Sequence, residues 1–493
     1  MIPTPGSPSA ATLPDILPHI TIIGGGITGM SAAYALQREA RASGRPVQIT
    51  LIERDARLGG KIATDRVRDC GEFVVEHGPD SFVTQKPQAL ELAVELGLSD
   101  RLIAANELPR KTFVLVKGRR VPLPEGLSLL VPTKLGPFLR SPLFSPAAKL
   151  RIALERFVPP RRESGDETIA DFVRRRFGQE MLERLGEPLL GGIHSCQVER
   201  QSMQATFPRF VAMEQQHGSL LAAAQAALRN APATSAPLSG PAKLRRAAFV
   251  TLKGGMAELV EALALRLEAR VLTGRAVTAV EPGDGAAYRV LLDDGTLIPT
   301  DALIITTPAY NTAKLVAPFA PDLAAGLRRI RYVSTGIATL AFRRSEIRAP
   351  IDGFGLVIPG SEGRRINACT LTSVKFDHRA PADTLLVRVF FGGSDTPEAM
   401  QLDDAALLEL VRSELKAVLG IDAAPLWTRI YRWWDSNPQY DLGHLERVDA
   451  LHALCPPGLL LAGSAYRGVG IPDCIRQGYE AAERVQTYVI RNA

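Results

Sequence analysis

The first apolar segment of the chain leads directly into a glycine-rich turn. Residues 19–23 form a β-branched run, Gly24–Gly29 follow at once, and an Ala-rich stretch at 30–42 precedes a second β-branched run at 47–52. This order predicts a strand, a tight turn, a helix and a second strand parallel to the first. It is the unit with which nucleotide-binding α/β domains begin.

The apolar pattern then changes from helical to strand-like and back to α/β. Helical periodicity covers 168–177, 179–190, part of 207–228, 256–269 and 404–419. Strand patterns cover 271–280, a hairpin of 288–292 with 297–299, the buried run 302–306, and alternating segments between 336 and 392. A short apolar strand at 459–462 and a helix that begins near Pro472 complete the pattern.

These elements predict an α/β plus α+β protein: a discontinuous Rossmann-like domain, an antiparallel-sheet substrate domain and a small helical subdomain. The boundaries that we expect are a leader at 1–17, the Rossmann-like domain at 18–85, 248–310 and 425–493, the substrate domain at 86–109, 205–247 and 311–424, and the helical subdomain at 110–204. The leader is rich in Pro, Ser, Thr and Ala, so we expect it to be disordered and not a signal peptide.

Composition is that of a soluble globular protein, with 46% apolar and 22% charged residues. The five cysteines are scattered, which suits a reducing cytosol, and no metal site is expected. Between positions 110 and 162 we count twelve Lys or Arg against two acidic residues, a balance of +10 in a chain whose net charge is +6. Apolar residues interleave with these charges. The stretch is either a surface for an anionic membrane or a helical subdomain with a solvated basic face, and nucleic acid is not expected to bind.

The glycine turn has the spacing G-x-G-x-x-G. Gly24 makes the tight turn, Gly26 lets the backbone approach a pyrophosphate, and Gly29 lets helix and strand pack closely. Glu53, at the end of the second strand, is placed to accept hydrogen bonds from a ribose. The continuation through Gly59-Gly60-Lys61 resembles that of FAD-dependent amine oxidases and their relatives, which favours FAD over NAD.

Further segments make the resemblance more specific. The chain is similar to the oxygen-dependent protoporphyrinogen/coproporphyrinogen oxidase family, and most like its Gram-positive branch, which oxidises coproporphyrinogen III. The segments that carry the match are 24–29 (GGGITG), 58–61 (LGGK), 76–82 (EHGPDSF), 131–138 (VPTKLGPF), 187–193 (EPLLGGI), 432–444 (RWWDSNPQYDLGH) and 468–474 (GVGIPDC). They span nearly the whole chain in the family's order.

The resemblance implies a site for non-covalent FAD. The ADP half would be held by Gly24, Gly26, Ile27, Thr28, Gly29, Glu53, Arg54 and Lys61. The flavin and its ribityl chain would lie along Gly78, Pro79, Asp80 and Ser81, and the remaining contacts would come from Val277, Trp433, Gly463, Val469, Gly470 and Ile471. The C-terminal helix would direct its positive end at the flavin pyrimidine ring.

The resemblance also implies a porphyrinogen substrate and O₂ as electron acceptor. Candidate substrate-binding residues are Arg110, Lys111, Gly191, Gly192, Leu356 (or Val357), Leu371 and Phe390. Thr112 stands where mitochondrial and plastid members have a propionate-binding arginine, which favours the tetra-carboxylated coproporphyrinogen III over protoporphyrinogen IX. The expected reaction is hydride transfer to the flavin, repeated until six electrons are removed, with release of H₂O₂. It is a step of haem biosynthesis, with hand-over to a ferrochelatase-type enzyme as a further expectation.

Asp80 is a candidate catalytic residue, since a carboxylate there could orient the site or accept a proton. A structural turn after Gly78-Pro79 is the alternative. Other functions remain open at this point: an amine oxidase or a carotenoid desaturase among enzymes, and a flavin-binding membrane scaffold outside them. The expected location is the cytoplasm, with peripheral contact to the inner face of the cell membrane as a possibility that the basic stretch raises.

Overall fold

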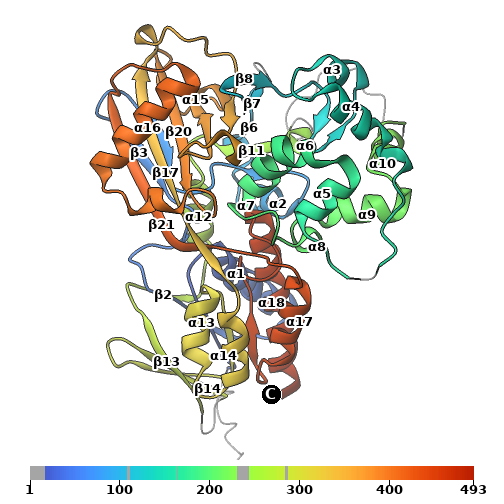
Figure 1. Cartoon of the computed structure of the whole chain (residues 1–493). Helices are drawn as coiled ribbons and strands as arrows, with labels where there is room; N and C mark the ends of the chain where they lie inside the picture. The colour runs from blue at the N-terminus through green and yellow to red at the C-terminus, as the bar shows by residue number, and fades with distance from the viewer. Residues whose placement is uncertain (1–16, 108–110, 164, 230–243, 284–286, 493) are drawn as a thin grey trace, which may run out of the picture.

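The computed structural model describes residues 17–107, 111–163, 165–229, 244–283 and 287–492. The expected leader, apart from Leu17, and the candidate Arg110 lie outside these ranges. Figure 1 shows a lower α/β lobe and two upper lobes, one built on a large sheet and the other helical.

A five-stranded parallel sheet forms the centre of the α/β lobe. Its strand order is β12 (Arg270–Thr273), β2 (Gln48–Glu53), β1 (His19–Ile23), β16 (Ala302–Ile305) and β22 (Leu459–Leu461). This is the predicted Rossmann-like sheet, and the chain reaches it in three separate passages. The carboxyl ends of β1, β16 and β22 meet at one edge, where α/β proteins bind their ligands.

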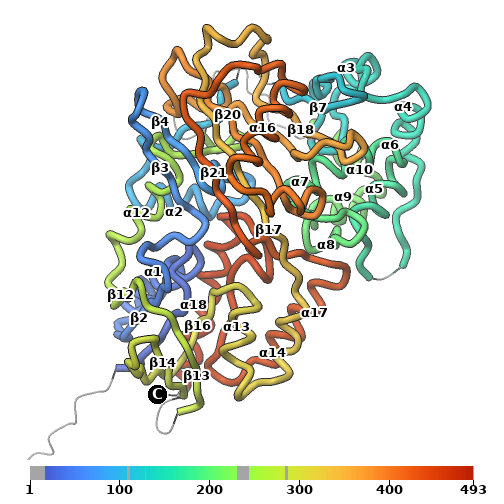
Figure 2. Tube along the Cα trace, turned by 60° about the vertical axis from the view of Figure 1, so that its left-hand side comes forward, coloured from blue at the N-terminus to red at the C-terminus, as the bar shows by residue number. Residues whose placement is uncertain are grey.

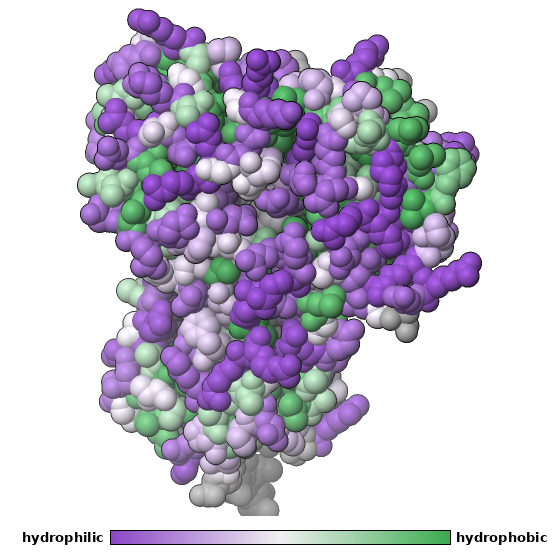
Figure 3. Space-filling model, viewed as in Figure 1, coloured by the Kyte–Doolittle hydropathy of each residue, from purple (hydrophilic) through white to green (hydrophobic). Residues whose placement is uncertain are grey.

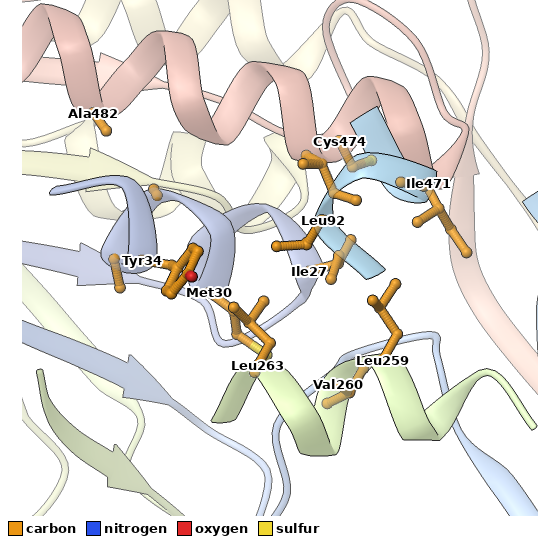
Figure 4. Close-up of a cluster of buried hydrophobic side chains, with 14 of the residues drawn as sticks. Ile27, Met30, Tyr34, Leu92, Leu259, Val260, Leu263, Ile471, Cys474 and Ala482 are labelled. Carbon is orange, nitrogen blue, oxygen red and sulfur yellow. The ribbon is translucent and has the colours of Figure 1, made fainter. Parts of the chain in front are cut away.

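Two apolar layers enclose this sheet. One face packs on α1 (Ile27–Ser43), α2 (Gln88–Glu95), α12 (Ala257–Ala264) and α18 (Ile471–Asn492). Figure 4 shows how Met30 of α1, Leu263 of α12 and Ala482 of α18 contribute to this layer. The other face packs on β13 (Val277–Pro282), β14 (Tyr288–Leu292), β15 (Leu297–Thr300), α13 (Ala309–Val316), α14 (Pro321–Arg328) and α17 (His444–Ala453).

The sheet lobe contains seven strands. Their order is β21 (Trp427–Pro438), β17 (Tyr332–Arg343), β20 (Thr384–Gly392), β19 (Ala368–Leu371), β18 (Gly355–Val357), β7 (Thr112–Val116) and β8 (Arg119–Pro122). All neighbouring pairs are antiparallel except β18 with β7. Helix α16 (Asp404–Leu419) covers one face. The long strands β17 and β21 run toward the junction with the α/β lobe (Figure 2).

The helical lobe packs around its own apolar core. It contains α3 (Leu135–Arg140), α4 (Pro146–Ala153), α5 (Ile169–Phe177), a π-helical segment (Leu182–Gly191), α8 (Met203–Thr206), α9 (Pro208–His217) and α10 (Leu220–Arg229). The predicted helices at 168–177 and 179–190 are therefore present, although the second is π-helical from Leu182 on, with Pro188 inside the π-helical segment.

The structure corrects several domain boundaries. Helix α2 packs with α1 and α18, and α13 and α14 cover the parallel sheet, so these three helices belong to the α/β lobe and not to the substrate domain. Strand β21 pairs with β17 in the seven-stranded sheet, although the Rossmann-like domain was expected to resume at 425. Strand β7 pairs with β18, while α9 and α10 join the helical core. Sequence order alone did not reveal these exchanges because each involves a neighbour distant along the chain.

One predicted strand is two. The expected strand at 271–280 divides into β12 and β13 at Gly274, whose φ of +64° turns the chain. The Gly274 N–H donates to the Asp55 carbonyl at 2.9 Å and the Arg275 N–H donates to the Glu53 carbonyl at 3.0 Å. The turn therefore brings the start of β13, and Val277 with it, close to the end of β2.

Candidate functional site

The glycine turn has no room for side chains at two of its three motif positions. Gly24 has a φ of +109°, and a Cβ atom there would lie 2.5 Å from Thr306 Oγ1. A Cβ atom at Gly29 would lie 2.0 Å from the Gly24 carbonyl oxygen. These contacts agree with the predicted roles of Gly24 in the tight turn and of Gly29 in close helix–strand packing.

Gly26 differs, because a Cβ atom there would meet nothing within 4 Å. Gly26 is the N-cap of α1, and this helix has neither a side-chain cap nor an acidic residue in its first turn. No side chain of the helix itself therefore caps its first-turn N–H groups or neutralises the positive end of its dipole. This arrangement fits the pyrophosphate of a dinucleotide.

Glu53 is held beside the same turn. Its Oε2 accepts the Gly25 N–H at 2.7 Å and its Oε1 accepts the Asp55 N–H at 2.9 Å. Each carboxylate oxygen keeps a lone pair for another donor, as a ribose contact requires. Arg54 is mostly exposed and lies 3.5 Å from Asp55, and Val277 begins β13 nearby.

A second loop passes close to the glycine turn. A Cβ atom at Gly78 would lie 2.4 Å from the Lys61 carbonyl oxygen, so the two segments are in contact. The Lys61 ammonium donates to the Ser436 carbonyl, and burial lowers its pKa. Trp433 Nε1 donates to the His77 carbonyl at 2.7 Å. Lys61, Gly78 and Trp433, which the resemblance assigned to the cofactor, thus lie on segments that meet at this position although they are hundreds of residues apart in the sequence.

Asp80 is held between two cations from the sheet lobe. Its Oδ2 lies 3.2 Å from both Lys375 Nζ and Arg388 Nη1, and Ser81 Oγ donates to its Oδ1 at 2.7 Å. Burial by itself would raise the pKa of Asp80, but Lys375 and Arg388 outweigh it and hold the pKa well below its usual range. So weak a base is a poor proton acceptor. The structure therefore argues against that role for Asp80 and supports the orienting role.

Arg388 also fixes the loop before Asp80. Its side chain is buried, and its Nη2 donates to the Gly78 carbonyl at 2.6 Å. Sequence reasoning missed both Arg388 and Lys375. A signal existed for Arg388, since it is a lone charge within the apolar run at 384–391, and a buried charge needs a partner. The partner, Asp80, could not be identified without the fold.

The C-terminal loop completes this edge of the α/β lobe. Gly463 has a φ of +125°, and a Cβ atom there would lie 3.4 Å from the Thr306 carbonyl oxygen. Helix α18 begins at Ile471, and its first-turn Asp473 pairs with Lys86 Nζ at 2.6 Å. Lys86 neutralises the charge of the Asp473 carboxylate. This carboxylate therefore does not cancel the positive end of the α18 dipole. Gly463 and the segment 469–471, which the resemblance assigned to the flavin, lie at this edge of the α/β lobe beside Thr306 and the start of α18.

Two predicted pocket residues face the wrong side of the seven-stranded sheet. Leu356 and Leu371 are buried in the core beneath α16. Because side chains alternate along a strand, the opposite face carries Val357, Arg388 and Phe390. The predictions for Leu356 and Leu371 are therefore wrong, whereas Phe390 and the alternative Val357 lie on the face toward Asp80.

The remaining substrate candidates differ in how much open space surrounds them. A Cβ atom at Gly191 would lie 3.0 Å from Val198, so this glycine serves internal packing. Gly192 has open space around its Cβ position, as a close approach to a ligand requires. Lys111 is exposed and lies 3.4 Å from Asp352. Within the described ranges, no cluster of three His, Cys, Asp or Glu side chains is arranged to hold a metal ion.

The helical lobe exposes an apolar surface among basic residues. Figure 3 shows apolar atoms gathered at the upper right, over this lobe. Phe157 is 77% exposed and Leu150 63%, and Lys149 and Arg156 are adjacent to them in sequence. None of the described helices has the length and apolar character that a membrane span needs.

Comparisons with known proteins agree with this geometry. The family model described as flavin containing amine oxidoreductase matches residues 27–486. A Bacillus subtilis protein named coproporphyrinogen III oxidase is 34% identical over 475 residues, covering 96% of this chain and 98% of that protein. A rice protein named chloroplastic protoporphyrinogen oxidase is 28% identical, covering 99% and 91%.

Solved structures are similar along the same length. The crystal structure of a protein titled putative protoporphyrinogen oxidase from Exiguobacterium is 31% identical, with a TM-score of 0.81, and the match covers 95% of this chain and 99% of that one. Cyclohexylamine oxidase from Brevibacterium oxydans is 15% identical with a TM-score of 0.69, over 96% of this chain and 100% of that one, which shows a shared fold alone.

Proposed function

Because this chain belongs to the flavin-containing amine oxidoreductase family, we propose that it is an FAD-dependent oxidase of a porphyrinogen, with coproporphyrinogen III as the preferred substrate. One observation carries the proposal: the similarity to a protein named coproporphyrinogen III oxidase extends over nearly the full length of both chains. The residues at the edge of the α/β lobe fit a flavin dinucleotide, which supports FAD as the cofactor.

The site residues divide the cofactor between two regions. Gly24–Gly29 and Glu53 would hold the pyrophosphate and ribose, and the loop at 78–81 with the segment at 469–471 would hold the flavin. When bound, the flavin would accept hydride from the substrate and pass electrons to O₂. Removal of six electrons from a porphyrinogen would yield the porphyrin, with H₂O₂ as the other product, for delivery to a ferrochelatase-type enzyme.

This chain's own residues would organise the reaction without a strong protein base. Arg388 fixes the Gly78 carbonyl and, with Lys375, keeps Asp80 ionised. Phe390 would present an aromatic side chain to the macrocycle from the same sheet face. Gly192 would allow the other side of the site to approach a flat ligand closely.

The test is anaerobic mixing of the purified yellow protein with coproporphyrinogen III, observed through the visible absorption of the oxidised flavin. We expect the absorption to bleach and then return when O₂ is admitted. A protein that binds FAD but never bleaches with either porphyrinogen would support a flavin-binding scaffold and contradict the proposal.

We further propose that the exposed face of the helical lobe docks on an anionic membrane surface from the cytoplasmic side. Phe157 and Leu150 would enter the interface while neighbouring lysines and arginines contact lipid phosphates. Phe157→Glu should weaken co-sedimentation with vesicles that contain anionic lipid by about tenfold. Leu265→Glu, at an 86% exposed position of the α/β lobe, is the matched control. Equal binding by both variants would contradict the docking face.

A further inference from the structure

The hydroxyl of Tyr440 joins two points of the C-terminal loop. It donates to the Ser464 carbonyl at 2.7 Å and accepts the Gly468 N–H at 2.9 Å. The Tyr440 side chain is 1% exposed, so both hydrogen bonds are shielded from water. One side chain from outside the loop therefore fixes the separation of Ser464 and Gly468, on either side of the turn between them.

His444, the first residue of α17, packs against Tyr440. Its ring stacks on the Tyr440 ring, with 3.9 Å between centroids and 13° between planes. Its Nε2 lies 2.8 Å from the Tyr466 carbonyl oxygen, the central residue of the same loop. The two aromatic residues thus contact three consecutive parts of the loop at 463–468.

The backbone around Tyr440 is bound to the helical lobe. The Ser202 N–H donates to the Tyr440 carbonyl at 2.7 Å, and the Leu442 N–H donates to the Arg200 carbonyl at 2.8 Å. Gln439 Nε2 donates to the His194 carbonyl at 3.4 Å. His194 lies two residues after Gly192, so the segment around Tyr440 lies between the C-terminal loop and the substrate-side glycine.

We infer that Tyr440 is a positioning residue, which sets the C-terminal loop against the flavin and ties it to the helical segment that carries Gly192. The inference rests on the proposed function, because it takes the loop at 463–471 to hold the flavin. It gives a physical role to the P-Q-Y-x-x-G-H segment, which the sequence marked only as similar to a family. The Tyr440 hydroxyl holds the loop through two hydrogen bonds, and the backbone hydrogen bonds of Tyr440 and Leu442 hold the tyrosine in place.

The test compares Tyr440→Phe with Tyr288→Phe. Tyr288 is also buried and donates through its hydroxyl, to the Pro457 carbonyl at 2.5 Å, but in the core layer opposite α1 and α18. Both variants lose one buried tyrosine hydroxyl, so we expect similar small decreases in melting temperature. Tyr440→Phe alone should raise the Kd of the apoprotein for FAD, measured by flavin fluorescence, about tenfold. It should also shift the visible absorption bands of the bound flavin.

Matching FAD affinities and flavin spectra for the two variants would overturn the inference. His444→Phe is the second variant if Tyr440→Phe does not fold. It keeps an aromatic ring against Tyr440, loses the contact with the Tyr466 carbonyl, and should weaken FAD binding in the same direction but less. Unchanged FAD binding by His444→Phe would count against the inference. If the wild-type apoprotein binds no FAD, the proposed function and the inference both fail; if it does and Tyr440→Phe is indistinguishable from it, the inference alone fails.

Discussion

Lys375 and Arg388 share one carboxylate, that of Asp80, and both cations are largely removed from water. Removing one partner of a buried ion pair leaves a charge without compensation, which costs more than the pair contributes. The three side chains also join the sheet lobe to the loop at 78–81. Their arrangement therefore affects stability and site geometry together.

Asp80→Asn should lower the free energy of unfolding by about 3 kcal/mol. Asp80→Asn combined with Lys375→Met should lower it by less than the sum of the single changes, because the double variant no longer buries an unpaired ammonium. Denaturant unfolding measures both. The acid limb of the pH–rate profile should stay in place in Asp80→Asn, and its loss would restore Asp80 as the proton acceptor.

Stability should fall in mild acid because of His444. Burial lowers the pKa of His444 to about 4 from an ordinary 6.5, although its contact with the Tyr466 carbonyl acts in the opposite direction. Nearby Arg447 and Arg467 lower the pKa further, and Asp441 raises it. Above pH 6.5 the ring is neutral in both the folded and unfolded states. Between pH 6.5 and about 4 the unfolded state binds a proton that the folded state does not, so stability is lost as the pH falls.

The slope that His444 contributes should be about 1.4 kcal/mol per pH unit in that window. His444→Phe should remove this part of the slope, measured by urea unfolding at pH 6.5 and 5. His217→Gln, at an exposed position, is the control. An unchanged slope in His444→Phe would show that the ring is not kept neutral by the fold.

Only those site residues that belong to a local sequence motif could be identified from the sequence. Gly24, Gly29 and Glu53 belong to one strand–turn–helix–strand unit, so their spacing in the sequence identifies them. Arg388 and Tyr440 act through partners more than twenty residues away in the sequence. A charge or hydroxyl with such a partner has no local signature.

At the scale of elements, the error at Leu356 and Leu371 has a simple origin. A strand's side chains alternate between faces, so a displacement of one residue exchanges the core for the pocket. β18 is apolar on both faces, and β19 places only Ala368 and Thr370 on its second face, so these short strands did not identify which face belongs to the core. Pairing with β20, where Arg388 and Phe390 identify the site face, decides it.

The helical lobe is built around the buried cation Arg176, which pairs with Glu155 and, at 3.2 Å, with Glu214. Glu155 and Arg176 are fully buried, and Glu155 also accepts the Leu220 N–H at 3.0 Å and the Ser219 hydroxyl at 2.6 Å. The Glu155–Arg176 pair thus joins α5 to the segment that follows α4 and to the start of α10. In the sequence Glu155 is merely one of two acids in a basic stretch, so neither its burial nor its role was predictable.

Glu155→Gln should destabilise the protein by roughly 3 kcal/mol, because Arg176 loses its fully buried partner and keeps only the Glu214 carboxylate, 3.2 Å from its Nη1. Glu163→Gln removes a carboxylate that is 84% exposed and 3.5 Å from Arg161, and should change stability by less than about 1 kcal/mol. Thermal or denaturant unfolding distinguishes them. Equal effects would mean that the buried pair does not hold the lobe together.

In the molecule as a whole, the order of α/β, helical and sheet segments was predictable from the sequence. Which lobe each helix or strand belongs to was not. Helices α13 and α14 follow β16 and fold back over its sheet, whereas β21 leaves the sheet lobe only at Pro438. The site lies where these passages meet. The part expected to bind the pyrophosphate and ribose belongs to one local unit. The parts expected to bind the flavin and the substrate depend on contacts between segments that are distant in the sequence.

We propose that a porphyrinogen with four carboxylates is the substrate. The most direct test measures porphyrin fluorescence during side-by-side turnover of coproporphyrinogen III and protoporphyrinogen IX, with H₂O₂ determined in parallel. We predict a kcat/KM at least about tenfold higher for coproporphyrinogen III, which corresponds to about 1.4 kcal/mol of transition-state binding. A higher kcat/KM for protoporphyrinogen IX, or oxidation of neither compound, would contradict the account.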